Sequence, residues 1–271
     1  MRVAVVAPAR AIERDVEPRV LALAALIAPS LDIAFHPQCF ERSGHFAGPD
    51  AMRAAAFLEV ANDPGIDAIW FARGGYGSNR ILDMVMPRLG PAARNKTWLG
   101  YSDIGFMLGA LYARRIGRPV HGPMPVEIGR DDGGVCVARS IAWLAGKDRA
   151  VLEPSLGGRP AAAFNLAILT AMLGTPWVPD LTDHVLMVEE VSEPLYRIDR
   201  MLFQLADGIQ LKGVAGLRLG EVVAVQPNDP PFGETPEAMA VRWAAAMGVP
   251  YLGRAMVGHS ADNHVVPFGI A

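Results

Sequence analysis

The sequence predicts an α/β protein whose N-terminal part is a mostly parallel sheet with helices on both faces. Short apolar runs alternate with segments of helical periodicity through the first half of the chain, as in repeated strand–helix units. The runs are apolar along their whole length, which is typical of strands buried on both faces. Hydrophobic residues make up 51% of the 271-residue chain, so a large core is expected.

The elements of the first half are predicted in chain order. Strands are expected at residues 3–7, 31–35, 66–71 and 98–101, and helices at residues 18–28, 50–60, 78–89 and 103–115. Asp50 lies where the positive end of its helix favours a carboxylate. Arg114, Arg115 and Gly117 form a cationic end followed by glycine, which is typical of a helix C-terminus. Sites on parallel sheets gather at the carboxyl ends of the strands, so the turns there are the candidates.

Residues 146–160 differ in composition from the segments around them. Charges, two prolines and the pair Gly157-Gly158 predict a linker. The expected domains are therefore residues 1–147 and a smaller, β-containing domain at 164–271, with the linker at 148–163. In the second domain, helices are predicted at residues 164–173, 196–206 and 236–247, and strands or β-like segments at 185–191, 220–225 and 254–270.

Composition and charge exclude several classes of protein. The formal net charge of −3 and the absence of a basic run argue against a nucleic-acid partner. Two cysteines make no disulfide framework and fit a reducing compartment. No apolar stretch approaches the roughly 20 residues that cross a bilayer, so a cytoplasmic protein without a membrane partner is expected.

Three kinds of side chain could together perform nucleophilic chemistry. Ser102 ends an apolar run at the start of a helical pattern, which is typical either of an exposed nucleophile on a sharp turn or of an ordinary N-cap. His259 lies among small and polar residues, as in an exposed loop. Glu189 and Glu190 end an apolar strand and face opposite ways, so one of them should face the cleft. Taken one at a time, Ser102 is more commonly an N-cap, a Gly-His pair such as residues 258–259 a turn, and paired glutamates at a strand end solvated. Sequence order alone cannot show whether the three kinds of residue meet in space.

Residues 73–77 (RGGYG) form a second candidate turn between a predicted strand and a predicted helix. The turn lacks both the ending of a P-loop and the spacing of a dinucleotide fingerprint, so its phosphate signal is weak. Its backbone N–H groups could instead stabilise an oxyanion. A further group, His36, Cys39 and His45, is interpreted as incidental rather than as a metal site.

Several ordered segments together resemble the LD-carboxypeptidase family of serine peptidases. They are residues 73–80 (RGGYGSNR), 100–104 (GYSDI), 188–202 (VEEVSEPLYRIDRML), 258–259 (GH) and 267–269 (PFG), with shorter matches at 46–50, 165–166 and 173–175. The family includes muropeptide LD-carboxypeptidases and the related microcin C self-immunity peptidases. The resemblance covers essentially the whole chain.

The resemblance implies a serine mechanism with residues from both domains. Ser102 is then the nucleophile, from the first domain, and His259 the general base and Glu189 the orienting acid, both from the second. Glu189 is preferred because the family pattern is an apolar strand followed by Glu and then Asp, and Glu190 matches the Asp. The active site would lie between the domains.

The remaining site residues are also carried over from the family. Backbone amides of Asp103 and, in the glycine turn, Gly75 would hold the oxyanion. The resemblance implies neither a metal nor a cofactor. A cation or backbone amides near the cleft should meet the substrate's terminal carboxylate, and Arg80 is a candidate cation that could equally be structural.

The implied activity is hydrolysis of the L,D-peptide bond that releases terminal D-alanine from a murein tetrapeptide during cell-wall recycling, by a homodimer. One alternative is a microcin C immunity-type peptidase that cleaves aminoacyl-nucleotide amides. Another is a non-catalytic binding protein on the same fold.

Overall fold

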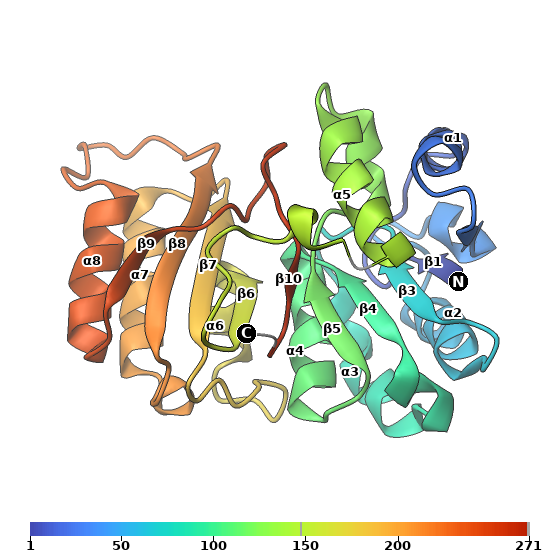
Figure 1. Ribbon diagram of the computed structural model, residues 1–271. Coiled ribbons are helices and arrows are strands. Elements are labelled where there is room, and N and C mark those ends of the chain that lie inside the picture. The colour runs from blue at the N-terminus through green and yellow to red at the C-terminus, as the bar shows by residue number, and fades with distance from the viewer. Residues whose placement is uncertain (147, 270–271) are drawn as a thin grey trace.

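Two sheets lie side by side in the computed structural model, which describes residues 1–146 and 148–269 (Figure 1). The sheets are formed by different halves of the chain, apart from one short strand near the C-terminus. Each sheet carries helices, and the predicted α/β class is confirmed.

The first sheet has six strands in the order β10-β5-β4-β3-β1-β2. Their bounds are β1 (Arg2–Val6), β2 (Asp32–Phe35), β3 (Ala68–Phe71), β4 (Thr97–Gly100), β5 (Arg118–His121) and β10 (Val266–Pro267). Strands β1 to β5 pair in parallel, and β10 pairs antiparallel with β5. All residues of β3 and β4 are buried, which explains why these strands are apolar throughout.

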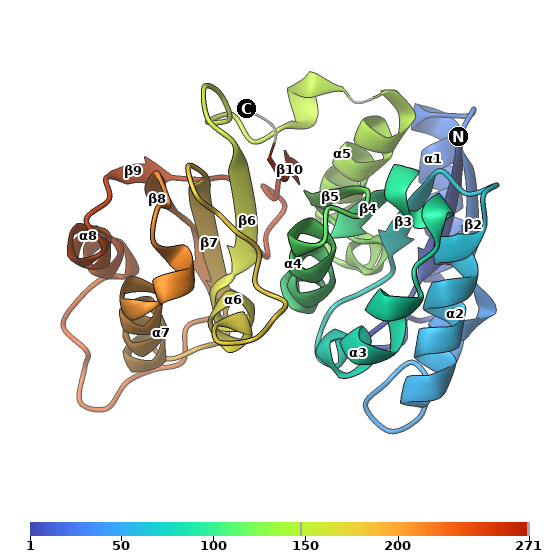
Figure 2. The same ribbon diagram turned by 90° about the horizontal axis from the view of Figure 1, so that it is seen from below.

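Helices cover both faces of this sheet, as predicted (Figure 2). One face carries α1 (Val16–Ile27) and α5 (Gly133–Gly146). The other carries α2 (Asp50–Asn62), the single turn α3 (Leu82–Val85) and α4 (Gly105–Ala113). Short 3₁₀ helices connect these elements and those of the second half, at Pro37–Phe40, Ser78–Ile81, Met86–Arg88, Pro91–Asn95, Ser102–Ile104, Pro125–Gly129, Arg149–Val151 and Ile209–Leu211.

The second sheet is smaller and entirely parallel. Its order is β6 (Ala161–Asn165), β7 (Val185–Val191), β8 (Gly216–Val223) and β9 (Tyr251–Arg254). The connecting helices are α6 (Leu166–Met172), α7 (Leu195–Asp207) and α8 (Pro236–Met247). All three lie on one face of the sheet (Figure 2).

The two halves are in close apolar contact through α4 and α6. A Cβ atom on Gly109 would lie 2.5 Å from the Cε of Met172, and one on Gly105 would lie 3.1 Å from a side-chain carbon of Ile168. Glycine at these two positions, one helical turn apart, therefore lets the helices approach. The chain also returns to the first sheet at its end, where β10 extends the sheet beyond β5.

Four elements differ clearly from the predictions made from sequence. Strand β5 and helix α5 were not predicted at all. Strand β6 occupies the end of the predicted linker and the start of the predicted helix 164–173, and β8 begins four residues before the predicted 220. The domain bounds 1–147, 148–163 and 164–271 stay a prediction, and Lys147, Ile270 and Ala271 lie outside the described residues.

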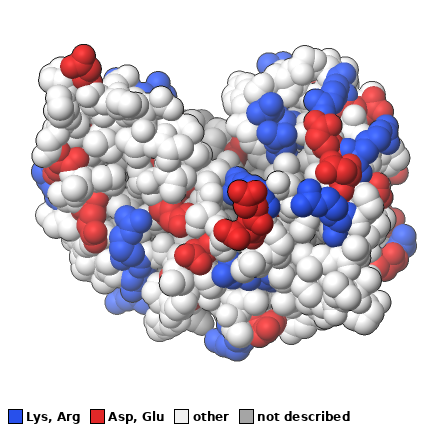
Figure 3. Space-filling model, turned by 90° about the horizontal axis from the view of Figure 1, so that it is seen from above, with Lys and Arg blue, Asp and Glu red and all other residues white. Residues whose placement is uncertain are grey.

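Basic and acidic side chains are interspersed on the face seen in Figure 3, which is hollowed between the two lobes. That face carries no continuous basic patch of the kind that binds nucleic acid. Among the described residues, none of the helices combines the length and apolar character needed to traverse a bilayer.

Candidate active site

Ser102 lies on a sharp turn between β4 and α4. Tyr101 is extended, and Ser102 then takes a φ of 59°, a left-handed conformation that is uncommon outside glycine. The chain enters a 3₁₀ turn at Ser102 and continues as α4. Such a strained strand–turn–helix corner presents the side chain above the carboxyl end of the sheet. This is the turn that the sequence predicted.

The structure brings Ser102, His259 and Glu189 together although they are far apart in the chain. The Nε2 of His259 lies 3.1 Å from the Oγ of Ser102, and its Nδ1 lies 2.7 Å from the Oε2 of Glu189. The Glu189 side chain is fully buried, and that of His259 is only 12% exposed. A hydroxyl, an imidazole and a buried carboxylate in this order can transfer a proton from the serine to the histidine.

Glu190, the neighbour of Glu189, faces a different partner. Its carboxylate accepts hydrogen bonds from the Asn165 side chain at 2.9 Å and from the backbone N–H groups of Ala167 at 2.8 Å and Val191 at 2.9 Å. It therefore occupies the N-terminus of α6 and does not reach the imidazole. The ladder between β7 and β8 shifts register around Glu189, a local irregularity of the kind that redirects side chains near active sites.

The environment of His259 favours its protonated form. Burial by itself would lower the pKa of the imidazole, but the charge of Glu189 and its hydrogen bond outweigh burial and raise that pKa. The ring also packs on Tyr101, with the centroids 4.9 Å apart. The hydroxyl of Tyr101 donates to the buried carboxylate of Glu127, so the ring beneath the histidine is fixed.

The loop that carries His259 is held at its base by one buried amide. The Oδ1 of Asn263 accepts from the backbone N–H of Gly258 at 3.2 Å and lies 2.8 Å from the Nε2 of His121. Burial lowers the pKa of His121 to about 4, so its neutral ring donates through Nε2 near pH 7. Arg130 adds a third contact by donating to the backbone oxygen of His259 at 3.0 Å.

The glycine turn lies against the serine turn. A Cβ atom on Gly74 would lie 3.2 Å from the backbone nitrogen of Asp103 and 3.3 Å from the Oγ of Ser102. The Asp103 carboxylate accepts from the N–H groups of Gly77 at 3.2 Å and Ser78 at 3.0 Å, which ties the two turns together. Gly75, with a φ of 108°, is the next residue along this turn. A side chain at residue 74 would therefore crowd both the Asp103 amide and the Ser102 hydroxyl.

Arg80 is engaged by other side chains. It forms an ion pair with Asp50 at 2.8 Å and stacks over the ring of Phe46, which assigns it a structural role. Sequence reasoning instead missed Arg10, Arg73 and Arg130, all of which lie near the catalytic group. Arg73 could have been suspected because it directly precedes the glycine turn.

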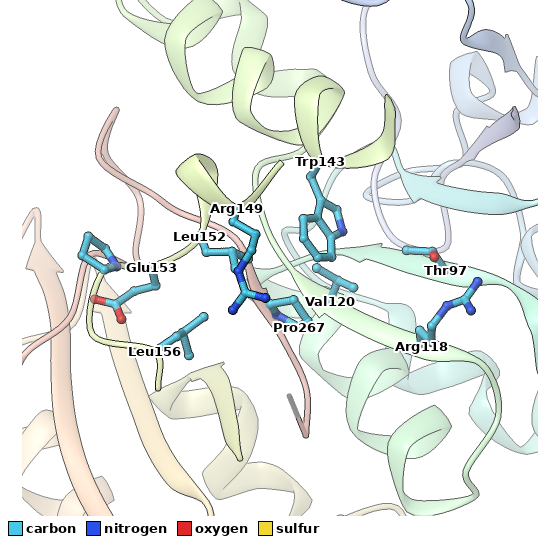
Figure 4. Close-up of a pocket in the computed structure, with 10 residues that line it drawn as sticks. Thr97, Arg118, Val120, Trp143, Arg149, Leu152, Glu153, Leu156 and Pro267 are labelled. Carbon is cyan, nitrogen blue, oxygen red and sulfur yellow. The ribbon is translucent and has the colours of Figure 1, made fainter. Parts of the chain in front are cut away.

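A cavity of about 620 Å³ lies away from Ser102 and His259 (Figure 4). Its lining includes Thr97 and Arg118, the first residues of β4 and β5, so it is at the opposite end of these strands from Ser102. Trp143 of α5 and Leu152 also line it. Among the residues that the structure describes, no three His, Cys, Asp or Glu side chains form a group suited to a metal ion.

The fold and the geometry are those of the serine hydrolase class, with Ser102 at the carboxyl end of a central parallel strand. The chain matches the model of the LD-carboxypeptidase N-terminal domain over residues 3–122 and that of the C-terminal domain over residues 160–271. It therefore belongs to the LD-carboxypeptidase family, a family of peptidases, and the resemblance seen in the sequence is confirmed.

Relatives that match over most of their own length are named as carboxypeptidases. The chain is 34% identical to a putative carboxypeptidase of Streptomyces coelicolor, over 99% of this chain and 88% of the relative. It is 29% identical to the murein tetrapeptide carboxypeptidase of Pseudomonas aeruginosa, over 99% and 91%.

Solved structures share the fold. Muramoyltetrapeptide carboxypeptidase from Oxalobacter formigenes superposes with a TM-score of 0.83 at 24% identity, over 99% of this chain and 93% of that one. The microcin C7 self-immunity protein in complex with glutamyl sulfamoyl guanosine gives a TM-score of 0.80 at 15% identity, over 99% and 91%.

Proposed function

We propose that this protein is a serine LD-carboxypeptidase that releases the terminal D-alanine of a murein tetrapeptide. The observation that carries the proposal is the line from Glu189 through His259 to Ser102, with contacts of 2.7 and 3.1 Å, in a member of the LD-carboxypeptidase family. The names of the relatives support the substrate class. The product would be a tripeptide available for cell-wall recycling.

In the first step, Ser102 is acylated by the substrate. Its Oγ attacks the scissile carbonyl carbon while the Nε2 of His259 takes the hydroxyl proton. The backbone N–H of Asp103 and the glycine turn, with Gly75 as the proposed second donor, hold the oxyanion, and each such donor is typically worth about 10²–10³ in turnover. The C–N bond then breaks, and His259 gives its proton to the leaving amine. Glu189 stabilises the imidazolium in between.

In the second step, water releases the product. His259 takes a proton from water, whose oxygen attacks the acyl carbon of the ester. The bond between this carbon and the Oγ of Ser102 breaks, and the proton returns from His259 to the serine. The buried Glu189 keeps the imidazole in the tautomer that both steps require.

The test is the release of free D-alanine from a synthetic murein tetrapeptide by the purified chain. A matched peptide ending in L-alanine reports stereochemical selectivity, and Ser102→Ala reports the role of the nucleophile. We expect turnover of the D-ended peptide by the wild-type chain alone. Turnover that survives Ser102→Ala would refute the mechanism. Cleavage of an aminoacyl sulfamoyl adenosine without cleavage of the tetrapeptide would replace the substrate by that of the microcin-immunity peptidases.

The proposal extends to the setting of the enzyme. We propose a cytoplasmic homodimer, with the nucleophile on domain 1–147 and the acid and base on domain 164–271. The free, buried Cys39 and Cys136 are compatible with a reducing compartment. Light scattering on the purified chain tests the dimer, and cell fractionation tests the location.

A further inference from the structure

Three arginines surround the serine and glycine turns. Arg73 directly precedes Gly74. The side chain of Arg10 lies against the same turn, because a Cβ atom on Gly75 would lie 2.3 Å from the Cδ of Arg10. On the histidine side, the Nη1 of Arg130 donates to the backbone oxygen of His259 at 3.0 Å.

Within this group, here called the arginine rim (Arg10, Arg73 and Arg130), the positive charges of Arg10 and Arg73 are poorly compensated. Within residues 1–146 and 148–269, no carboxylate forms an ion pair with Arg10 or Arg73, and Arg73 donates only to the backbone oxygen of Ala11, at 3.3 Å. Arg130 differs in that it forms an ion pair with Glu127 at 4.0 Å: burial by itself would lower its pKa, but nearby Tyr101 and Glu127 outweigh burial and raise it.

The charges of the rim also act on one another. Burial lowers the pKa of Arg73, and the nearby charges of Arg10, Arg42 and Arg130 lower it further, against an opposite effect of Glu13. Half-buried cations that repel one another are stabilised when an anion binds between them. Other arginines of the same region differ, because Arg53 and Arg80 both bind Asp50.

A carboxypeptidase substrate brings an anion to this place. Its free carboxylate belongs to the residue that leaves, so it lies only about one residue spacing, roughly 3.8 Å, beyond the scissile bond. Guanidinium groups suit such a carboxylate because their planar fork can donate two parallel hydrogen bonds.

We propose that the arginine rim is the subsite that binds the ionised terminal carboxylate of the peptide, and that it restricts the enzyme to chain ends. This inference rests on the proposed function for the identity of the ligand. Its selectivity has a simple origin. A C-terminal amide, or a peptide one residue longer, would present no charge at the rim when its fourth residue occupies the leaving position.

Equilibrium binding tests the inference without turnover. Calorimetry on the Ser102→Ala variant compares the tetrapeptide with its C-terminal amide, which differs in that charge alone. We expect the free acid to bind roughly 10- to 100-fold more tightly, the range of hydrogen bonds to charged groups. Arg10→Gln, Arg73→Gln and Arg130→Gln in the same background should each weaken binding of the acid and leave binding of the amide nearly unchanged.

Two controls separate binding from folding. Arg94→Gln removes an exposed cation from the 3₁₀ helix Pro91–Asn95, before β4, and should keep the full preference for the acid. Arg73→Lys keeps the charge and should recover part of the preference, and in the active enzyme Arg73→Gln should raise KM more than it lowers kcat. Thermal unfolding shows whether each variant folds. Where a glutamine variant does not fold, the lysine variant at the same position replaces it.

The outcomes distinguish this inference from the proposed function. Equal affinity for acid and amide, equal loss of both in the rim variants, or binding of neither peptide would overturn the carboxylate subsite. A clear preference for the acid without D-alanine release by the wild-type chain would support the subsite and refute the proposed activity.

Discussion

Glu189 and Glu190 are consecutive residues of β7, and their carboxylates serve opposite sides of the second sheet. The Oε2 of Glu189 lies 2.7 Å from His259, whereas the Oε2 of Glu190 accepts from the backbone of Ala167 at 2.8 Å. The alternation of side chains along a strand separates the two roles. One carboxylate can act in catalysis while its neighbour fixes the start of α6, which packs against the helix that follows Ser102.

Glu189→Gln should reduce turnover with little loss of stability. An amide has the shape of the carboxylate but cannot neutralise the imidazolium that forms on His259. We expect kcat to fall by about 10²–10⁴, by analogy with other triads whose acid is replaced by an amide. D-alanine release gives kcat, and urea unfolding measures stability. An unchanged kcat would remove Glu189 from the mechanism.

Glu190→Gln should show the reverse pattern. The NH₂ group of the glutamine would replace one carboxylate oxygen and would face existing hydrogen-bond donors. These are either the N–H of Ala167 or the N–H groups of Asn165 and Val191. Losing hydrogen bonds to a buried charged group costs about 1–3 kcal/mol, so the free energy of unfolding should fall by this amount. Catalysis by the folded fraction should change far less than in Glu189→Gln. A catalytic defect at wild-type stability would contradict the assignment.

The raised pKa of His259 predicts opposite pH trends for activity and stability. Activity needs the neutral ring, so the acid limb of kcat/KM should titrate above 6.5, the ordinary value. The interaction that raises the pKa stabilises the folded state fully below 6.5, and this stabilisation is lost as pH rises through the folded-state pKa. Glu189→Gln should move the acid limb to lower pH, since burial then dominates. A limb that stays in place would show that another group titrates.

Much of the fold could be predicted because local pattern and burial agree. Strands β3 and β4 are short and wholly buried, so their apolar runs were visible in the sequence. Strand β5 has four residues and contains Pro119, and β6 is rich in alanine, so neither has strong strand character. Their strand conformation comes from pairing with neighbours that are distant in sequence, which a local pattern does not contain.

Part of the candidate site could likewise be predicted from the sequence, and part of it could not. The turn at Ser102 was predictable from an apolar run that ends before a helix. Its proximity to His259 depends on how the two halves pack, and the catalytic roles of Ser102, His259 and Glu189 stay predictions. For Arg80 the sequence left a substrate cation and a structural role open, and the pair with Asp50 favours the structural role; Asp50 lies thirty residues away in sequence and becomes adjacent only on folding.

Gly74→Ala should remove activity without unfolding the protein. The added Cβ would lie 3.2 Å from the Asp103 nitrogen and 3.3 Å from the Ser102 oxygen, beside the groups proposed to act on the scissile carbonyl. We expect kcat to fall by about 10²–10³, as when an oxyanion donor is lost. Gly129→Ala is the matched control, because a Cβ there would meet no atom within 4 Å. If Gly74→Ala matched this control in kcat, the oxyanion could not lie beside residue 74, and the donor would have to be sought elsewhere.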